Sequence, residues 1–295
     1  MSSSSQTLWV VATPLGNLGD LSARAREVLG QVDLVLAEDT RRTGMLFKQA
    51  GLPKKKFLSL FEHNETARAA EVVSQLQTGS SVALVSDAGT PLVSDPGYRL
   101  VRSVRQAGFR VAPVPGPSAV LAALTVSGLP PTPFTFLGFL PRKPGEQRKA
   151  LEPFAGLKTT LIFFERKSRL PGTLALAHAV LGEREVCIAR ELTKVHEQVT
   201  TCHLSQAREA AENLLGEITV VVGPPLEEHG LSTENDIQEM LLRELERGGP
   251  PREVVARVVA RSHGWSRKSV YAAYQAVKAA GGLRASPDGN ESEGG

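Results

Sequence analysis

The sequence is poor in the residues that build disulfide scaffolds and metal centres. Cys187 and Cys202 are the only cysteines among 295 residues, and no pair of His residues accompanies them. This pattern argues against a disulfide framework or a zinc site, so we expect a reduced, cytoplasmic setting and no bound metal. No apolar run has the length of a membrane span, and residues 1–6 lack the basic and apolar regions of a signal peptide. We therefore expect no membrane partner.

Familiar catalytic motifs are missing as well. The chain contains no Gly-x-Ser-x-Gly, His-Glu-x-x-His or Cys-x-x-Cys pattern, so the motifs give no support to nucleophilic or metal catalysis. Acidic residues are absent from positions 254–287, although the whole chain has a net charge of only +3. The basic residues of that stretch are Arg257, Arg261, Arg267, Lys268, Lys278 and Arg284. Such local asymmetry indicates an anionic partner for the C-terminal part.

Strand-like and helix-like segments alternate along the first two-thirds of the chain, which predicts an α/β fold. We expect an N-terminal domain over residues 7–115 with a largely parallel sheet. A Pro/Gly break then leads to a less regular α/β domain over 116–226, for which we expect a mixed sheet. Residues 232–283 predict a small all-α domain resembling a helix-turn-helix, and the polar tail 284–295 is expected to be disordered.

Three loops rich in Gly and Pro follow predicted strands of the N-terminal domain. They cover residues 13–20, 85–97 and 115–118. Each alone is most simply an ordinary turn, but together they predict the walls of one cleft, because loops after parallel strands gather at one sheet edge. Asp87 is the first acidic residue after its strand and suits a ribose hydroxyl or an ammonium group. Asp95 is a candidate cap for the helix that follows.

Paired carboxylates and paired arginines stand at another strand end. Glu38 and Asp39 precede Arg41 and Arg42. This arrangement suits proton transfer beside a phosphate, although a helix cap with a solvated first turn explains it equally well.

The predicted last helix carries a basic surface. Arg267, Tyr271 and Lys278 share one side by helical spacing, with Lys268 nearby. Arg and Lys suit phosphates and Tyr stacks on bases, so we favour nucleic-acid contact over a merely solvated face.

Seven segments in this order resemble the bacterial ribosomal RNA small-subunit methyltransferase I family, which belongs to the tetrapyrrole methylases. The resemblance extends from about Leu8 to Val222 and on to the helical domain. The segments are residues 10–20, Glu38-Asp39-Thr40-Arg41, His63-Asn64-Glu65, residues 85–97, Pro115-Gly116-Pro117-Ser118, Gly138-Phe139-Leu140-Pro141 and Arg190-Glu191-Leu192-Thr193-Lys194.

The resemblance implies two α/β domains with S-adenosylmethionine (SAM) in the cleft between them, and a homodimer. It implies methylation of the ribose 2′-hydroxyl of a cytidine in 16S rRNA of the small ribosomal subunit. The cofactor contacts that it implies are Leu15, Asp87, Thr90, Ser118, Ala119 and Phe164.

A base is expected to assist the ribose hydroxyl in this reaction, and Glu38 or Asp39 are our candidates. We expect Arg41 and Arg42 to bind RNA, together with the basic surface of the last helix. Two alternatives remain open. One is a corrin or sirohaem methylase of the same superfamily, and the other is a small-molecule sensor with a helix-turn-helix output.

Overall fold

The computed structural model describes residues 6–212, 214–226, 233–262 and 265–282. The chain divides into two compact units, 1–226 and 227–295, and each is treated by itself. The predicted tail 284–295 lies outside the described residues, as do both ends of the predicted helical domain, 232 and 283.

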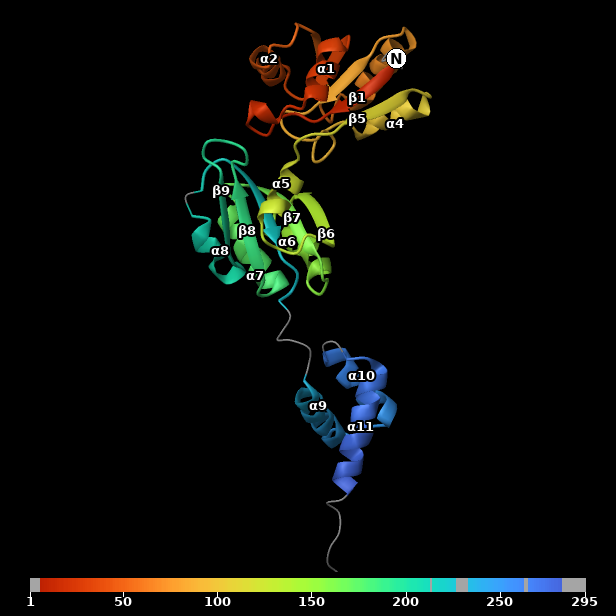
Figure 1. Cartoon of the computed structure of the whole chain (residues 1–295), viewed down its shortest axis with the longest axis vertical. Helices are drawn as coiled ribbons and strands as arrows, with labels where there is room; N and C mark the ends of the chain where they lie inside the picture. The colour runs from red at the N-terminus through yellow and green to blue at the C-terminus, as the bar shows by residue number, and fades with distance from the viewer. Residues whose placement is uncertain (1–5, 213, 227–232, 263–264, 283–295) are drawn as a thin grey trace, which may run out of the picture. The chain divides into compact units, whose positions relative to one another are not determined.

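The first unit begins with a parallel sheet, drawn in red to yellow in Figure 1. Its described strands lie in the order β3-β2-β4-β1-β5. The strands are β1 (Thr7–Val11), β2 (Leu34–Ala37), β3 (Lys56–Ser59), β4 (Val82–Val85) and β5 (Arg110–Val114). The helices between them are the 3-10 helix η1 (Leu18–Asp20), α1 (Ala23–Gln31), α2 (Thr40–Gln49), α3 (Glu65–Gln77) and α4 (Tyr98–Gln106).

Both faces of this sheet are covered. Val35 and Val85 point into an apolar cluster shared with α1 and α2. Leu36 and Leu84, one position along the same strands, point into a second cluster shared with α3 and α4. Burial on both faces explains why β2 and β4 are continuous apolar runs instead of alternating patterns. The carboxyl ends of the strands are thereby left as the open edge where loops can bind a ligand.

A second sheet follows in the same unit, with the order β6-β7-β10-β8-β9 among the described strands. Its strands are β6 (Phe134–Phe139), β7 (Thr160–Arg166), β8 (Glu185–Arg190), β9 (Gln198–His203) and β10 (Glu217–Val222). The β6–β7 pair is parallel and the other pairs are antiparallel, which confirms the predicted mixed sheet. The predicted boundary at 115/116 falls in the connection between β5 and the next helix.

Helices cover the second sheet unequally. One face packs against α6 (Pro144–Leu151), α7 (Leu170–Leu181) and α8 (Leu204–Ala210), with the 3-10 helix η2 (Glu152–Phe154) beside them. The other face packs against α5 (Ala119–Val126) and against Leu15 from the N-terminal loop. The second sheet therefore meets the first domain on the α5 side.

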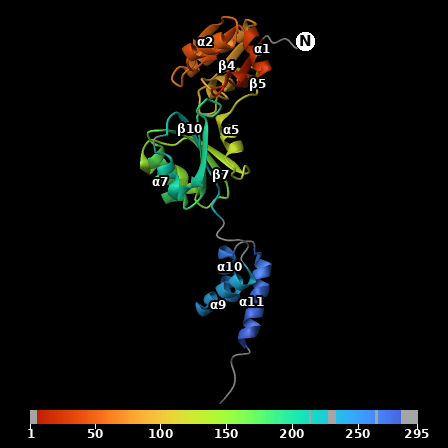
Figure 2. The same ribbon diagram turned by 60° about the vertical axis from the view of Figure 1, so that its left-hand side comes forward.

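The described part of the second unit consists of α9 (Glu234–Glu246), α10 (Pro251–Arg261) and α11 (Arg267–Gly282), which Figure 2 shows packed together. The Thr233 side chain and the Asp236 carboxylate form a capping box at the start of α9. Ile237, Val254 and Tyr274, one from each helix, belong to its buried core. Among the described helices of the whole chain, none is long and apolar enough to span a membrane.

Candidate functional site

A cavity of about 610 Å³ opens at the carboxyl ends of β1 and β4. Each of the three loops rich in Gly and Pro contributes to its wall, and residues of β7 and β10 close it from the second sheet. The six residues expected to contact a cofactor all line this one cavity: Leu15, Asp87, Thr90, Ser118, Ala119 and Phe164.

Hydrogen bonds hold the three loops together. Thr13 and Gly89 exchange backbone N–H···O bonds of 2.9 Å in both directions. The Thr13 hydroxyl donates to the carbonyl of Ser86 at 3.1 Å, and the Thr90 hydroxyl donates to the carbonyl of Pro117 at 3.0 Å. Gly89 has φ of 80°, and a Cβ atom there would lie 3.2 Å from a Leu15 methyl group. The wall is therefore rigid and is built largely from backbone.

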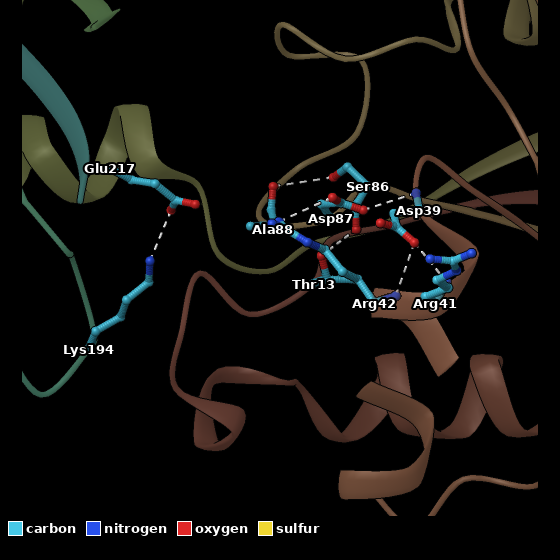
Figure 3. Close-up of polar contacts among 9 residues, drawn as sticks. All are labelled: Thr13, Asp39, Arg41, Arg42, Ser86, Asp87, Ala88, Lys194 and Glu217. Carbon is cyan, nitrogen blue, oxygen red and sulfur yellow. Dashed lines mark hydrogen bonds and ion pairs between the residues drawn. The ribbon is translucent and has the colours of Figure 1, made fainter. Parts of the chain in front are cut away.

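Asp87, which lines the cavity, is held in a fixed orientation by two polar contacts (Figure 3). The Asp39 N–H donates to one of its carboxylate oxygens at 3.1 Å, and Arg42 forms an ion pair with the other at 3.3 Å. Partial burial nevertheless raises the pKa of Asp87 above its ordinary value, because desolvation outweighs these contacts.

The two candidate bases differ in their surroundings. Asp39 is the N-cap of α2, where its carboxylate accepts hydrogen bonds from the N–H groups of Arg41 and Arg42. These bonds lower the pKa of Asp39. Burial, followed by repulsion from Asp87, raises the pKa of Glu38. Neither Glu38 nor Asp39 is among the described residues that line the cavity, although the Asp39 N–H contacts Asp87, which does line it.

Asp95 lines the cavity, although the sequence made it a candidate helix cap. The cap of α4 is not Asp95 but the buried carboxylate of Glu65, which accepts the N–H groups of Gly97, Arg99 and Leu100. Asp95 instead borders the cavity, where burial and repulsion from Glu38 raise its pKa to about 6. The sequence feature that indicates this position is the Gly/Pro loop 85–97, which is predicted to form a wall of the cleft.

The expected RNA-binding residues lie in separate parts of the chain. Arg41 and Arg42 are exposed in the first turn of α2. Arg267, Lys268, Tyr271 and Lys278 are all exposed on α11, in the second unit. In that unit Arg257 and Arg261 form ion pairs with the buried Glu244, at 2.7 and 2.9 Å. They belong to an internal network, although the acid-free stretch suggested that they were available to an anionic partner.

A contact between the two α/β domains borders the cavity. Lys194 forms ion pairs of 3.1 Å with Glu191 and with Glu217, and Glu217 lines the cavity (Figure 3). The aliphatic stem of Lys194 crosses Gly16 of the N-terminal loop. The next residue, Asn17, donates its N–H to the Thr193 hydroxyl at 3.2 Å. The first and second domains are thereby joined at one rim of the cavity.

Comparison with known proteins is informative over most of the chain. The family model of the tetrapyrrole (corrin/porphyrin) methylases matches residues 7–208. The chain is 42% identical over 270 residues to the ribosomal RNA small subunit methyltransferase I of Haemophilus influenzae, covering 90% of this chain and 94% of that protein. It is 47% identical over 239 residues to the protein of the same name from Mesorhizobium japonicum, covering 80% of each.

Solved structures share the fold at low identity. Uroporphyrin-III C-methyl transferase from Thermus thermophilus, complexed with S-adenyl homocysteine, is similar with a TM-score of 0.54 and 20% identity, over 74% of this chain and 96% of that one. Diphthine synthase is similar with a TM-score of 0.59 and 14% identity, over 74% and 89% of the two chains. Together with the family model, these likenesses confirm the expected two-sheet α/β fold.

Proposed function

We propose that this chain, which belongs to the ribosomal RNA small subunit methyltransferase I family of the tetrapyrrole methylases, methylates the ribose 2′-hydroxyl of a cytidine in 16S rRNA. The observation that carries the proposal is the single cavity that gathers all six expected cofactor contacts from separate loops. As in its family, the methyl donor is SAM, and the acceptor is RNA of the small ribosomal subunit.

The residues of the cavity fit SAM. A volume of about 610 Å³ lies within the range of roughly 300–1,000 Å³ that is usual for small-molecule sites. The carboxylates of Asp87, Asp95 and Glu217 border it and favour a ligand that carries positive charge. Gly89 leaves room for close approach of a ligand to the backbone. We assign Leu15, Asp87, Thr90, Ser118, Ala119 and Phe164 to cofactor binding.

When bound, SAM supplies a methyl group on a sulfonium, which is already a good leaving group. The chain must align the ribose oxygen with that methyl group and accept the hydroxyl proton. Alignment by a rigid wall supplies much of the rate enhancement. The reacting groups are already held in place, so they lose little further entropy when they react. A carboxylate with a raised pKa is the better proton acceptor, which favours Glu38 over the capping Asp39 within the proposed pair.

The proposed RNA contacts fall into two groups. Arg41 and Arg42 stand beside the cavity and suit phosphates near the target nucleotide. The second group is the exposed surface of α11 with Arg267, Lys268, Tyr271 and Lys278, which we propose also binds the RNA. We also propose that the chain acts as a homodimer in the cytoplasm.

Transfer of tritium from labelled SAM to small ribosomal subunits that lack the modification tests the reaction, with nucleoside mapping of the product. The expected product is a single 2′-O-methylcytidine. Label on a base, or on another ribose, contradicts the proposed position. Methylation of a porphyrinoid with none of rRNA would favour the corrin or sirohaem methylase. Sequence-specific retention of DNA without any methylation would favour the sensor.

A further inference from the structure

The Gly138-Phe139-Leu140-Pro141 segment has no role in the reaction described so far. It ends β6, the edge strand that pairs in parallel with β7. Phe136 is opposite Ile162, but Phe139 is opposite Phe164, so three steps on β6 match two on β7. Such an extra residue is a bulge, and bulges near active sites re-aim side chains.

The bulge decides which face Phe139 occupies. In a regular strand Phe139 would share the face of Leu137, which packs in the cluster with α6, α7 and α8. Phe136 lies on the opposite face, in the cluster with α5. The extra residue moves Phe139 onto the face of Phe136. Both rings consequently contact Phe164, with centroid separations of 5.0 Å for Phe136 and 5.4 Å for Phe139.

Gly138 makes this turn possible. Its φ of 67° lies in the left-handed region that other residues avoid. A Cβ atom there would also lie 3.2 Å from the Ser94 hydroxyl, and Ser94 is a cavity residue. The conformation of the strand end is therefore tied to the shape of the cavity wall.

The outcome is an aromatic ring that is not buried. Phe139 lines the cavity, yet 54% of it is exposed, whereas Phe136 and Phe164 are half-buried. Leaving a Phe side chain largely in water forgoes part of the stabilisation that its burial would give. A single exposed apolar residue needs no explanation, but a bulge that carries one from an apolar cluster to a cavity mouth indicates a ligand with an aromatic face.

From these observations we infer that Phe139 is the platform on which the target nucleobase of the RNA stacks. Proteins bind unpaired RNA bases by stacking them on aromatic rings, and enzymes that do chemistry on a base hold it out of its neighbours' stack. Arg166 and Lys167 are exposed and line the same cavity, where they suit the adjoining phosphates. This inference rests on the proposed function.

The adenine of SAM is the other candidate nucleobase for this ring, and the test separates the two. The test compares three variants of one residue, Phe139→Ala, Phe139→Leu and Phe139→Trp, with the control variant Phe134→Ala. Phe134 lies on the same face at the other end of β6, is 42% exposed, and is not among the described residues that line the cavity. The measurements are KM for unmodified small subunits, kcat, and the Kd of SAM by calorimetry.

Because stacking contributes about 1–3 kcal/mol per base, we expect Phe139→Ala to raise KM for the subunit at least about fivefold. Phe139→Leu keeps an apolar side chain without an aromatic face and should share the defect, whereas Phe139→Trp should remain near wild type. The Kd of SAM and the Phe134→Ala variant should be unchanged.

Three results would overturn the inference. A higher Kd of SAM with an unchanged KM for the subunit would place adenine on the ring. Normal kinetics in Phe139→Leu would show that apolar packing suffices, and loss of a dimer with unchanged kinetics would make the ring a subunit contact. No methyl transfer by the wild-type chain would instead contradict the proposed function, and this inference with it.

Discussion

Lys194 crosses Gly16, and no side chain larger than hydrogen fits beneath it. A Cβ atom at position 16 would collide with the stem of Lys194, whose ammonium group bridges Glu191 and Glu217. Glu217 is a cavity residue, so the packing of one glycine is linked to the charge at the cavity rim.

We expect Gly16→Ala to weaken SAM binding several-fold with little loss of fold stability. The added methyl group collides with the Lys194 stem, so the loop that carries the cofactor contact Leu15 has to shift. The ion pairs of Lys194 are broken as well, but as partly exposed pairs they contribute no more than about 1 kcal/mol to stability. Gly30→Ala in α1 is the matched control, because a Cβ atom there meets nothing within 4 Å. Calorimetric titration with SAM should show the defect in Gly16→Ala alone; equal affinity in both variants would contradict the link.

Glu65 governs the loop that carries Asp95. One buried oxygen of Glu65 accepts three N–H groups at the start of α4, and Glu65→Ala leaves those donors without it. We expect the free energy of unfolding to fall by about 2–3 kcal/mol, as measured by urea denaturation. Glu71→Ala, which removes a more exposed ion pair with Arg68, should change it by less than about 1 kcal/mol. Similar losses in the two variants would show that Glu65 is not a special cap.

The limits of prediction from this sequence follow from how far apart in the chain the partners lie. Local patterns suffice for the alternating strands and helices, and for the Asp39 cap, whose donors are two and three residues away. The sequence points to nearby Asp95 as the cap on α4, but the acceptor, Glu65, lies 32 residues before Gly97. The hydrogen bond of Asn17 with Thr193 joins residues 176 apart, and no local pattern indicates it.

The basic stretch of the second unit shows the same limit. Because positions 254–287 contain no acidic residue, the sequence predicts that Arg257 and Arg261 are available to a partner. The carboxylate that forms ion pairs with both arginines belongs to Glu244, which lies on the preceding helix and outside that stretch. Hydrogen bonding by Arg257 lowers the pKa of Glu244. Sequence periodicity identifies the exposed face of α11 because that face depends only on helical spacing.

Glu38→Gln and Asp39→Asn test the proposed pair of bases. We expect both variants to lose turnover and to keep SAM affinity, as a role in proton transfer requires. Asn caps helices about as well as Asp, so a defect in Asp39→Asn reports the charge and not the cap. The measurements are single-turnover methylation rates and the Kd of SAM. Full activity in both variants would eliminate the pair and direct attention to Asp95.

Asp95→Asn should stabilise the protein at neutral pH. Burial and repulsion from Glu38 and Asp87 raise the pKa of Asp95 from 3.8 to about 6, so the folded state binds this proton more tightly than the unfolded state. Stability contributed by Asp95 is therefore greatest at acidic pH and is lost as pH rises towards and through about 6. Removing the charge should gain roughly 1–2 kcal/mol at pH 7.5, allowing for solvent screening, and almost nothing at pH 4.

A carboxylate with the opposite shift provides the control. Asp33 accepts the N–H and hydroxyl of Ser81, and these bonds lower its pKa. Asp33→Asn should therefore destabilise the protein at pH 7.5, with the difference from wild type shrinking as the pH falls through the acidic range. Thermal melts of both variants between pH 4 and 8 give the comparison. A pH-independent effect of Asp95→Asn would show that its burial does not govern its charge.

The exposed face of α11 should bind RNA through charge and stacking in separable ways. Replacing Arg267, Lys268 and Lys278 by Gln should reduce the steepness of log K against log salt by about 0.7–0.9 for each phosphate that these side chains neutralise in the wild-type complex. Tyr271 is 48% exposed, and Tyr271→Ala should weaken binding without altering that slope. Gln at Lys54, Lys56 and Lys149, all exposed in the first unit, is the equal-charge control. Filter binding of small-subunit RNA over a salt series measures both effects. The same slope change in the control would show that net charge, and not this helix face, holds the RNA.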